Sequence, residues 1–100
     1  MDVLLEKLNK LDISDLSKFR AKDALETICA GSRYHIIKTE EYKEYAVLIN
    51  NTIVIKSKQY DYAGATALRK ETPVSLEDFV AYLDSRAVEI EETQTRIRGK

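Results

Sequence analysis

The side chains of this chain that could do chemistry are lysines and tyrosines gathered in its middle third. The chain has six tyrosines, and all but one lie between Tyr34 and Tyr62. Over residues 56–62 they share the two-residue period of a β-strand with lysines. Lysines that hold phosphates, beside rings that stack on bases, are typical of a sheet that binds RNA or single strands. The candidate binding residues are Lys43, Tyr45, Lys56, Lys58, Tyr60 and Tyr62.

Other uses of these side chains remain open. Lysine and tyrosine are ordinary residues of an exposed strand, where lysine also prevents sheets from pairing edge to edge. Tyrosine is also enriched at protein interfaces, because it offers a large contact area at low entropic cost. Arg33 and Lys38 join the group only if the order of the strands brings them there. The sequence therefore predicts a binding face, which meets either a protein or a nucleic acid.

Groups suited to catalysis or metal binding are sparse. His35 is the single histidine and Cys29 the single cysteine. Cys29 falls at the end of a predicted helix, where the helix dipole does not favour a thiolate. No cysteines or histidines have the spacing of metal ligands, and no phosphate-binding loop or nucleophile motif occurs. We therefore predict that the protein is not an enzyme and uses no metal and no cofactor.

The composition favours one small domain over residues 1–100. Hydrophobic residues make up 44% of the chain, which is enough for a modest core. Charged residues make up 33%, but the net charge is −1, which favours neither a general polyanion binder nor an acidic mimic of nucleic acid. One cysteine allows no internal disulfide, and no apolar run approaches the roughly 20 residues of a membrane span. We predict a cytoplasmic protein without a signal peptide or a membrane partner.

The apolar spacing predicts two helices at the start of the chain. Leucines recur at helical spacing between residues 4 and 11, which predicts an amphipathic helix over residues 2–11. Asp12 or Ser14 can cap a second helix over residues 15–30, and Gly31 can end it with a positive φ. The residues predicted to face inward from the second helix are Leu16, Phe19, Leu25 and Ile28.

The hydrophobic period then changes to two, which predicts strands over residues 33–38, 44–49 and 52–60. Asn50 and Asn51 fit a two-residue type I′ turn, because asparagine tolerates a positive φ. The hairpin that this turn closes is apolar on both faces at its tip, so each of these faces needs a covering layer. Residues 61–72 fit a fourth strand, a helical turn or a loop, and the sequence does not choose among them.

That turn also sets the register of the hairpin. It places Tyr45 opposite Lys56 and Ile49 opposite Thr52. Because successive side chains point to opposite faces, Lys43, Lys58 and Tyr60 would then share one face with them.

The last quarter of the chain predicts a long helix with a heptad seam. Ser75 is a good N-cap, and apolar residues then recur in steps of four and three. The seam is longer than a domain of this size is wide, so we predict that it meets a second copy of the chain or another helix lengthwise. The residues predicted to form this dimer contact are Leu83, Ala87, Ile90, Gln94 and Ile97.

The predicted class is α+β, with two N-terminal helices, an antiparallel sheet of three or four strands and a long C-terminal helix. All helices are expected on one face of the sheet. This order of elements is common in small regulators and in phage-encoded inhibitors, an analogy of size and class that also suggests a viral protein. We predict a homodimeric protein-binding module that inhibits or regulates a larger protein complex by occupying its surface. The alternative is a nucleic-acid-binding regulator that uses the Lys/Tyr face.

The heptad seam predicts the oligomeric state. Light scattering on the intact protein should give about twice the mass of one chain. Ile90→Asp should weaken the dimer, because it places a charge in the apolar seam. A monomer at roughly tens of micromolar protein would contradict the prediction.

Overall fold

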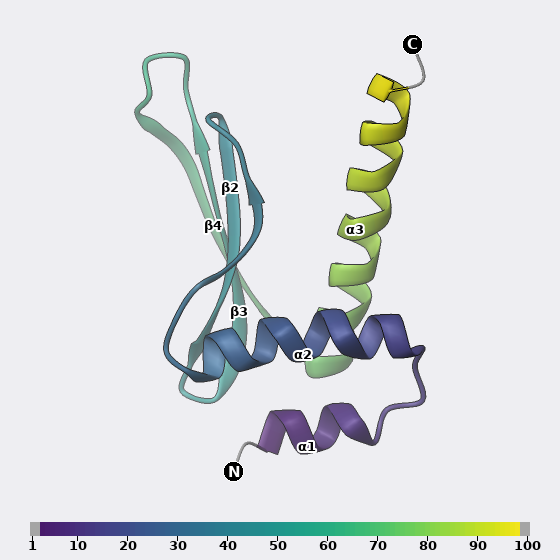
Figure 1. The fold of residues 1–100 in the computed structure, drawn as a ribbon. Helices are drawn as coiled ribbons and strands as arrows, with labels where there is room; N and C mark the ends of the chain where they lie inside the picture. The colour runs from purple at the N-terminus through teal and green to yellow at the C-terminus, as the bar shows by residue number, and fades with distance from the viewer. Residues whose placement is uncertain (1–2, 99–100) are drawn as a thin grey trace.

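The computed structural model describes the backbone of residues 3–98 and the side chains of residues 3–87. Its elements are α1 (Val3–Asn9), α2 (Asp15–Cys29), β1 (Tyr34–Lys38), β2 (Tyr42–Ile49), β3 (Thr52–Tyr60), β4 (Thr66–Val74) and α3 (Leu76–Arg98). The four strands form an antiparallel meander in the order β1-β2-β3-β4. The predicted α+β class is confirmed, with a fourth strand in the sheet (Figure 1).

The helices lie together on one side of the sheet (Figure 1). Helix α2 packs against α1 and α3 and against strands β1 and β2. Phe79 of α3 and Leu25 of α2 are fully buried between the helices and the sheet. Strands β2 and β3 contribute Ala46, Ile53 and Ile55 to the same core. Among the described residues, no helix or strand covers the opposite face of the sheet.

Helix α2 begins and ends at the predicted signals. The Ser14 hydroxyl accepts a hydrogen bond from the backbone N–H of Ser17 at 3.1 Å, which is the N-cap interaction. Gly31 has a φ of 87°, and its N–H donates to the carbonyl of Ile28 at 3.1 Å. A glycine with positive φ directly after the C-cap satisfies carbonyls that the helix itself leaves unpaired.

The prediction that Leu16 and Phe19 face inward is wrong. Their side chains are 58% and 72% exposed, whereas Ala21 and Ala24 of the same helix are fully buried. The two alanines lie on the side of α2 that packs toward the core and α3. At 100° per residue, Leu16 and Phe19 lie on the opposite side of the helix from this buried face. Leu25 and Ile28 are buried as predicted.

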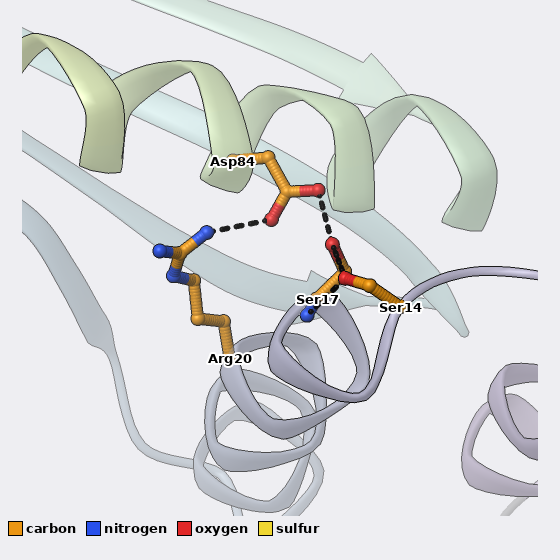
Figure 2. A network of polar contacts seen from close by, with 4 residues as sticks. All are labelled: Ser14, Ser17, Arg20 and Asp84. Carbon is orange, nitrogen blue, oxygen red and sulfur yellow. Dashed lines mark hydrogen bonds and ion pairs between the residues drawn. The ribbon is translucent and has the colours of Figure 1, made fainter.

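A polar contact fixes the place where α3 crosses α2 (Figure 2). The Ser17 hydroxyl donates to one Asp84 carboxylate oxygen at 2.6 Å, and Arg20 Nη1 lies 3.0 Å from the other. The Ser14 hydroxyl donates to that of Ser17 at 3.0 Å, so the cap of α2 is linked to α3. An ion pair whose two side chains are 25% and 34% exposed contributes about 1 kcal/mol or less, so its main effect is on orientation.

The β2–β3 hairpin has the predicted turn and register. Asn50 and Asn51 have φ values of 49° and 62°, as a type I′ turn requires. Tyr45 lies opposite Lys56, and Ile49 lies opposite Thr52. Because side chains alternate between faces, this pairing fixes which residues of the hairpin lie on each side of the sheet.

Residues 61–72, which the sequence left open, form a turn and most of strand β4. The Asp61 carboxylate accepts hydrogen bonds from the backbone N–H groups of Ala63 and Ala65. Gly64 has a φ of 84°, which favours glycine at that position of the turn. Strand β4 continues through Pro73, and a proline is tolerated there because β4 is an edge strand.

Helix α3 begins at the predicted cap, and the first half of its apolar seam packs into the core of its own chain. The Ser75 hydroxyl accepts a hydrogen bond from the N–H of Asp78 at 3.1 Å. Leu76, Val80 and Leu83 are at most 6% exposed and belong to the core. The part of the seam with described side chains therefore packs against its own domain.

The five residues of the predicted dimer contact differ in where the structure places them. Leu83 is buried in the core, so it is not available to a second chain. Ala87 is half-buried beside α2 and β1. Ile90, Gln94 and Ile97 lie outside the residues whose side chains are described. The heptad seam as a dimer contact stays a prediction.

Phe79 should contribute more to stability than any exposed aromatic residue. Phe79→Ala should lower the free energy of unfolding by about 3–5 kcal/mol, because the side chain is 0% exposed. Phe19→Ala is the matched control, and at 72% exposure it should change that free energy by about 0.5 kcal/mol or less. Unfolding in denaturant, followed by circular dichroism, measures both. Equal losses in the two variants would contradict this placement of the core.

Candidate functional site

The two faces of the sheet differ in what they meet. One faces the helices and carries Ala46, Ile53 and Ile55. We call the other the open face, because no described element lies against it. By strand pairing and ring contacts, the open face carries Arg33, His35, Lys38, Lys43, Tyr45, Val47, Ile49, Thr52, Val54, Lys56, Lys58, Tyr60, Thr66, Arg69, Glu71 and Pro73.

The predicted binding residues lie on the open face, except for one. Those brought together there are Lys43, Tyr45, Lys56, Lys58 and Tyr60. Tyr62 lies in the turn between β3 and β4, and its side chain is fully exposed. Strand β3 ends at Tyr60, so the two-residue period that placed Tyr62 on this face no longer applies.

One end of the open face is apolar. Near the Asn50–Asn51 turn it carries Val47, Val54 and Ile49. Val54 is 9% exposed, and Ile49, at the tip of the hairpin, is 41% exposed. The prediction that this tip is apolar on both faces is confirmed, but only the helix side has a covering layer among the described residues.

Tyr45 is at the centre of the other, basic end. Its side chain is only 5% exposed, although no helix lies over it. The Arg33 guanidinium is 4.9 Å from its ring centre and the Lys58 ammonium is 5.8 Å away. The electrons of an aromatic ring attract such cations. Tyr45 therefore supports a layer of basic side chains, and its own ring is not free to stack on a base.

The open face concentrates positive charge in a chain whose net charge is −1. The single carboxylate among the strand residues of this face, Glu71, lies 3.1 Å from the Lys56 ammonium. A shallow cavity of about 230 Å³ lies among Arg33, Lys58 and Arg69. Such a surface attracts anionic groups. The lysines and arginines of the face are Arg33, Lys38, Lys43, Lys56, Lys58 and Arg69.

A second polar site, which the sequence analysis did not predict, lies on the helix side of the sheet. Glu44 is a carboxylate that is only 2% exposed. It accepts hydrogen bonds from the hydroxyl of Tyr42 at 2.7 Å and from that of Tyr82, and Arg86 Nη2 lies 3.3 Å away. Arg86 Nε also donates to the Tyr82 hydroxyl at 2.9 Å. The buried charge is therefore matched, which a buried carboxylate requires.

This Glu44 cluster links strand β2 to helix α3. A cavity of about 270 Å³ borders it, with Ser57 and Lys70 also in its wall. The two-residue period could have located Glu44, because it lies two positions before the buried Ala46. Nothing in the local sequence identifies Tyr82 and Arg86 as its partners, because they come from a distant helix. Since the donors match the carboxylate, we interpret the cluster as structural.

Comparison with known proteins adds no relative. No protein-family model, curated protein or solved structure matches the chain.

Within residues 3–98, no helix is both long enough and apolar enough to cross a membrane. Among residues 3–87, whose side chains are described, no three or more His, Cys, Asp or Glu side chains are grouped as a metal site would require. His35 lies on the open face, its ring 6.0 Å from that of Tyr45, and Cys29 is half-buried at the end of α2.

The Glu44 cluster predicts an alkaline limit to stability. Burial, followed by the hydrogen bond to Glu44, raises the pKa of Tyr82 to about 12 from its usual 10.0. The folded state resists losing this proton, so the stabilisation is complete below pH 10 and is lost as the pH rises through about 12. Tyr82→Phe should remove the last step of tyrosine ionisation in the ultraviolet absorbance. Tyr62→Phe, at a fully exposed position, should leave that last step in place. An unchanged last step in Tyr82→Phe would contradict the assignment.

Proposed function

We propose that this protein is a small, non-enzymatic binding module that places its open face on the surface of a larger protein. One observation carries the proposal: the open face has an apolar end and a basic end, and no described element covers either. Ile49 at the apolar end is 41% exposed. A protein can offer apolar contacts and acidic groups side by side, as mixed interfaces do.

The module acts by covering a surface of its partner, and so inhibits or regulates the complex to which that partner belongs. A sheet face supported by a packed helical layer can block a surface without any chemical step. A homodimer formed through the distal part of α3 would carry two such faces, which raises apparent affinity when both engage one assembly. Cytoplasmic location belongs to the same proposal.

Nucleic-acid binding is the second candidate, favoured by the excess of lysines and arginines over carboxylates on the open face. It ranks second because single strands are held largely by stacking on exposed rings, and the two tyrosine rings of this face are covered. Tyr45 is only 5% exposed, and the Lys43 ammonium lies 5.4 Å from the ring centre of Tyr60. The apolar end would also have no role against phosphates.

Substitutions at the two ends of the open face test the proposal. Ile49→Asp and Lys58→Glu should each weaken binding to the same captured partner, because each places an acidic group where the interface needs an apolar or basic one. The expected loss is more than about fivefold in Kd for a residue near the centre of the contact. The measurement is capture from the cell of origin, followed by titration of the purified partner.

Matched controls make the same substitutions on the helix side. Leu16→Asp changes an apolar residue that is 58% exposed, and Lys22→Glu changes a lysine whose side chain is 64% exposed. Both should bind the partner as the unchanged protein does. A partner that is lost with the helix-side variants and kept with the open-face variants would overturn the proposal.

A further inference from the structure

Strand pairing aligns four basic residues in one row across the sheet. Lys38 of β1 lies opposite Lys43 of β2, which lies opposite Lys58 of β3, which lies opposite Arg69 of β4. We call these four residues the basic row. Neighbouring strands are about 4.8 Å apart, so the row crosses about 14 Å of the open face.

The positive charges of the basic row repel one another across the strands, although Lys43 and Lys58 also contact tyrosine rings. Like charges directly opposite each other on neighbouring strands repel. Among the described residues, none of the four has an ion-pair partner, whereas Lys56 in the next row has Glu71. Protection of sheet edges would account for Lys38 and Arg69, which are on edge strands. It does not account for Lys43 and Lys58, which are on the two central strands.

We infer that the basic row is the contact site for an acidic helix of the partner protein, which crosses the strands with its carboxylates over the row. The inference rests on the proposed function and names the chemistry of the partner. Residues three and four apart on a helix are about 5–6 Å apart, close to the spacing of the row. An extended chain places same-face side chains about 6.6 Å apart, which matches less well.

The apolar end of the open face selects the same kind of helix. Val47 and Val54 lie opposite each other, four residues along their strands from Lys43 and Lys58. Four residues of strand span about 13 Å, and a helix with its side chains is about 10–12 Å wide. A helix centred between the two ends can therefore place acidic side chains on the row and apolar ones near Val54. The partner element is an amphipathic helix with an acidic stripe beside an apolar one.

A synthetic peptide provides the probe. The striped peptide carries glutamates at steps of three and four beside a row of leucines, and a scrambled peptide of the same composition spreads them around the helix. The unchanged protein should bind the striped peptide more tightly, and added salt should weaken that binding. Lys58→Glu should weaken it by about tenfold, because it removes one attraction and adds one repulsion. Lys22→Glu is the matched control and should change nothing.

Thermal stability supplies an independent readout. Lys58→Glu places a carboxylate between Lys43 and Arg69, so two repulsions become attractions, and together these outweigh the lost contact of the Lys58 ammonium with the Tyr45 ring. Its midpoint of thermal unfolding should therefore rise by roughly 2–8 °C, even as binding is lost. Added salt should raise the midpoint of the unchanged protein more than that of the variant. A lysine with a purely structural role would not change binding and stability in opposite directions.

Several outcomes overturn the inference. These are no detectable binding of the striped peptide at low salt, equal binding of the two peptides, or a lower unfolding midpoint in Lys58→Glu. Tighter binding of a single-stranded DNA oligonucleotide than of the striped peptide would assign the row to nucleic acid instead. If Ile49→Asp loses the captured partner and Lys58→Glu keeps it, the proposed function stands and this inference fails. If both variants keep the partner, both fail.

Discussion

The helices of this chain bury only one face of its sheet, and the rest of the structure depends on that limit. Phe79 and Leu25 fill the space between the helices and the strands, which leaves the second face without a covering layer in the described part of the chain. Basic side chains over Tyr45 shield part of that face. Ile49 at the tip of the hairpin stays exposed. The open face is therefore the side of the sheet that the described elements leave uncovered.

Polar contacts decide how the helical layer sits on the sheet. Apolar packing is not directional, so it would allow α3 several orientations across α2. Hydrogen bonds are directional, and two acidic residues use them here. Asp84 joins Ser17 and Arg20 of α2, and Glu44 of β2 joins Tyr82 of α3. With α3 held on the helix side, no described helix covers the lysines on the other face.

Much of the local structure, and part of the site, could be predicted from the sequence. Asn50 and Asn51 determine the hairpin turn, and the turn determines the pairing of Tyr45 with Lys56. Ser14, like Ser75 before the last helix, marks a helix start because a cap needs only the next few residues. The Lys/Tyr face followed from the same strand period, which is a property of the backbone. These features depend on residues close together in the chain.

The tertiary structure decided everything that depends on distant residues. Phe19 is exposed because α2 turns the face with Ala21, Leu25 and Ile28 toward the core, and Phe19 lies on the opposite side of the helix. Residues 66–74 form a strand because β3 offers them an edge to pair with. The alignment of Lys38, Lys43, Lys58 and Arg69 exists only when four separate segments take one register. The near-zero net charge conceals that row, because a total over the chain carries no information on where folding places each charge.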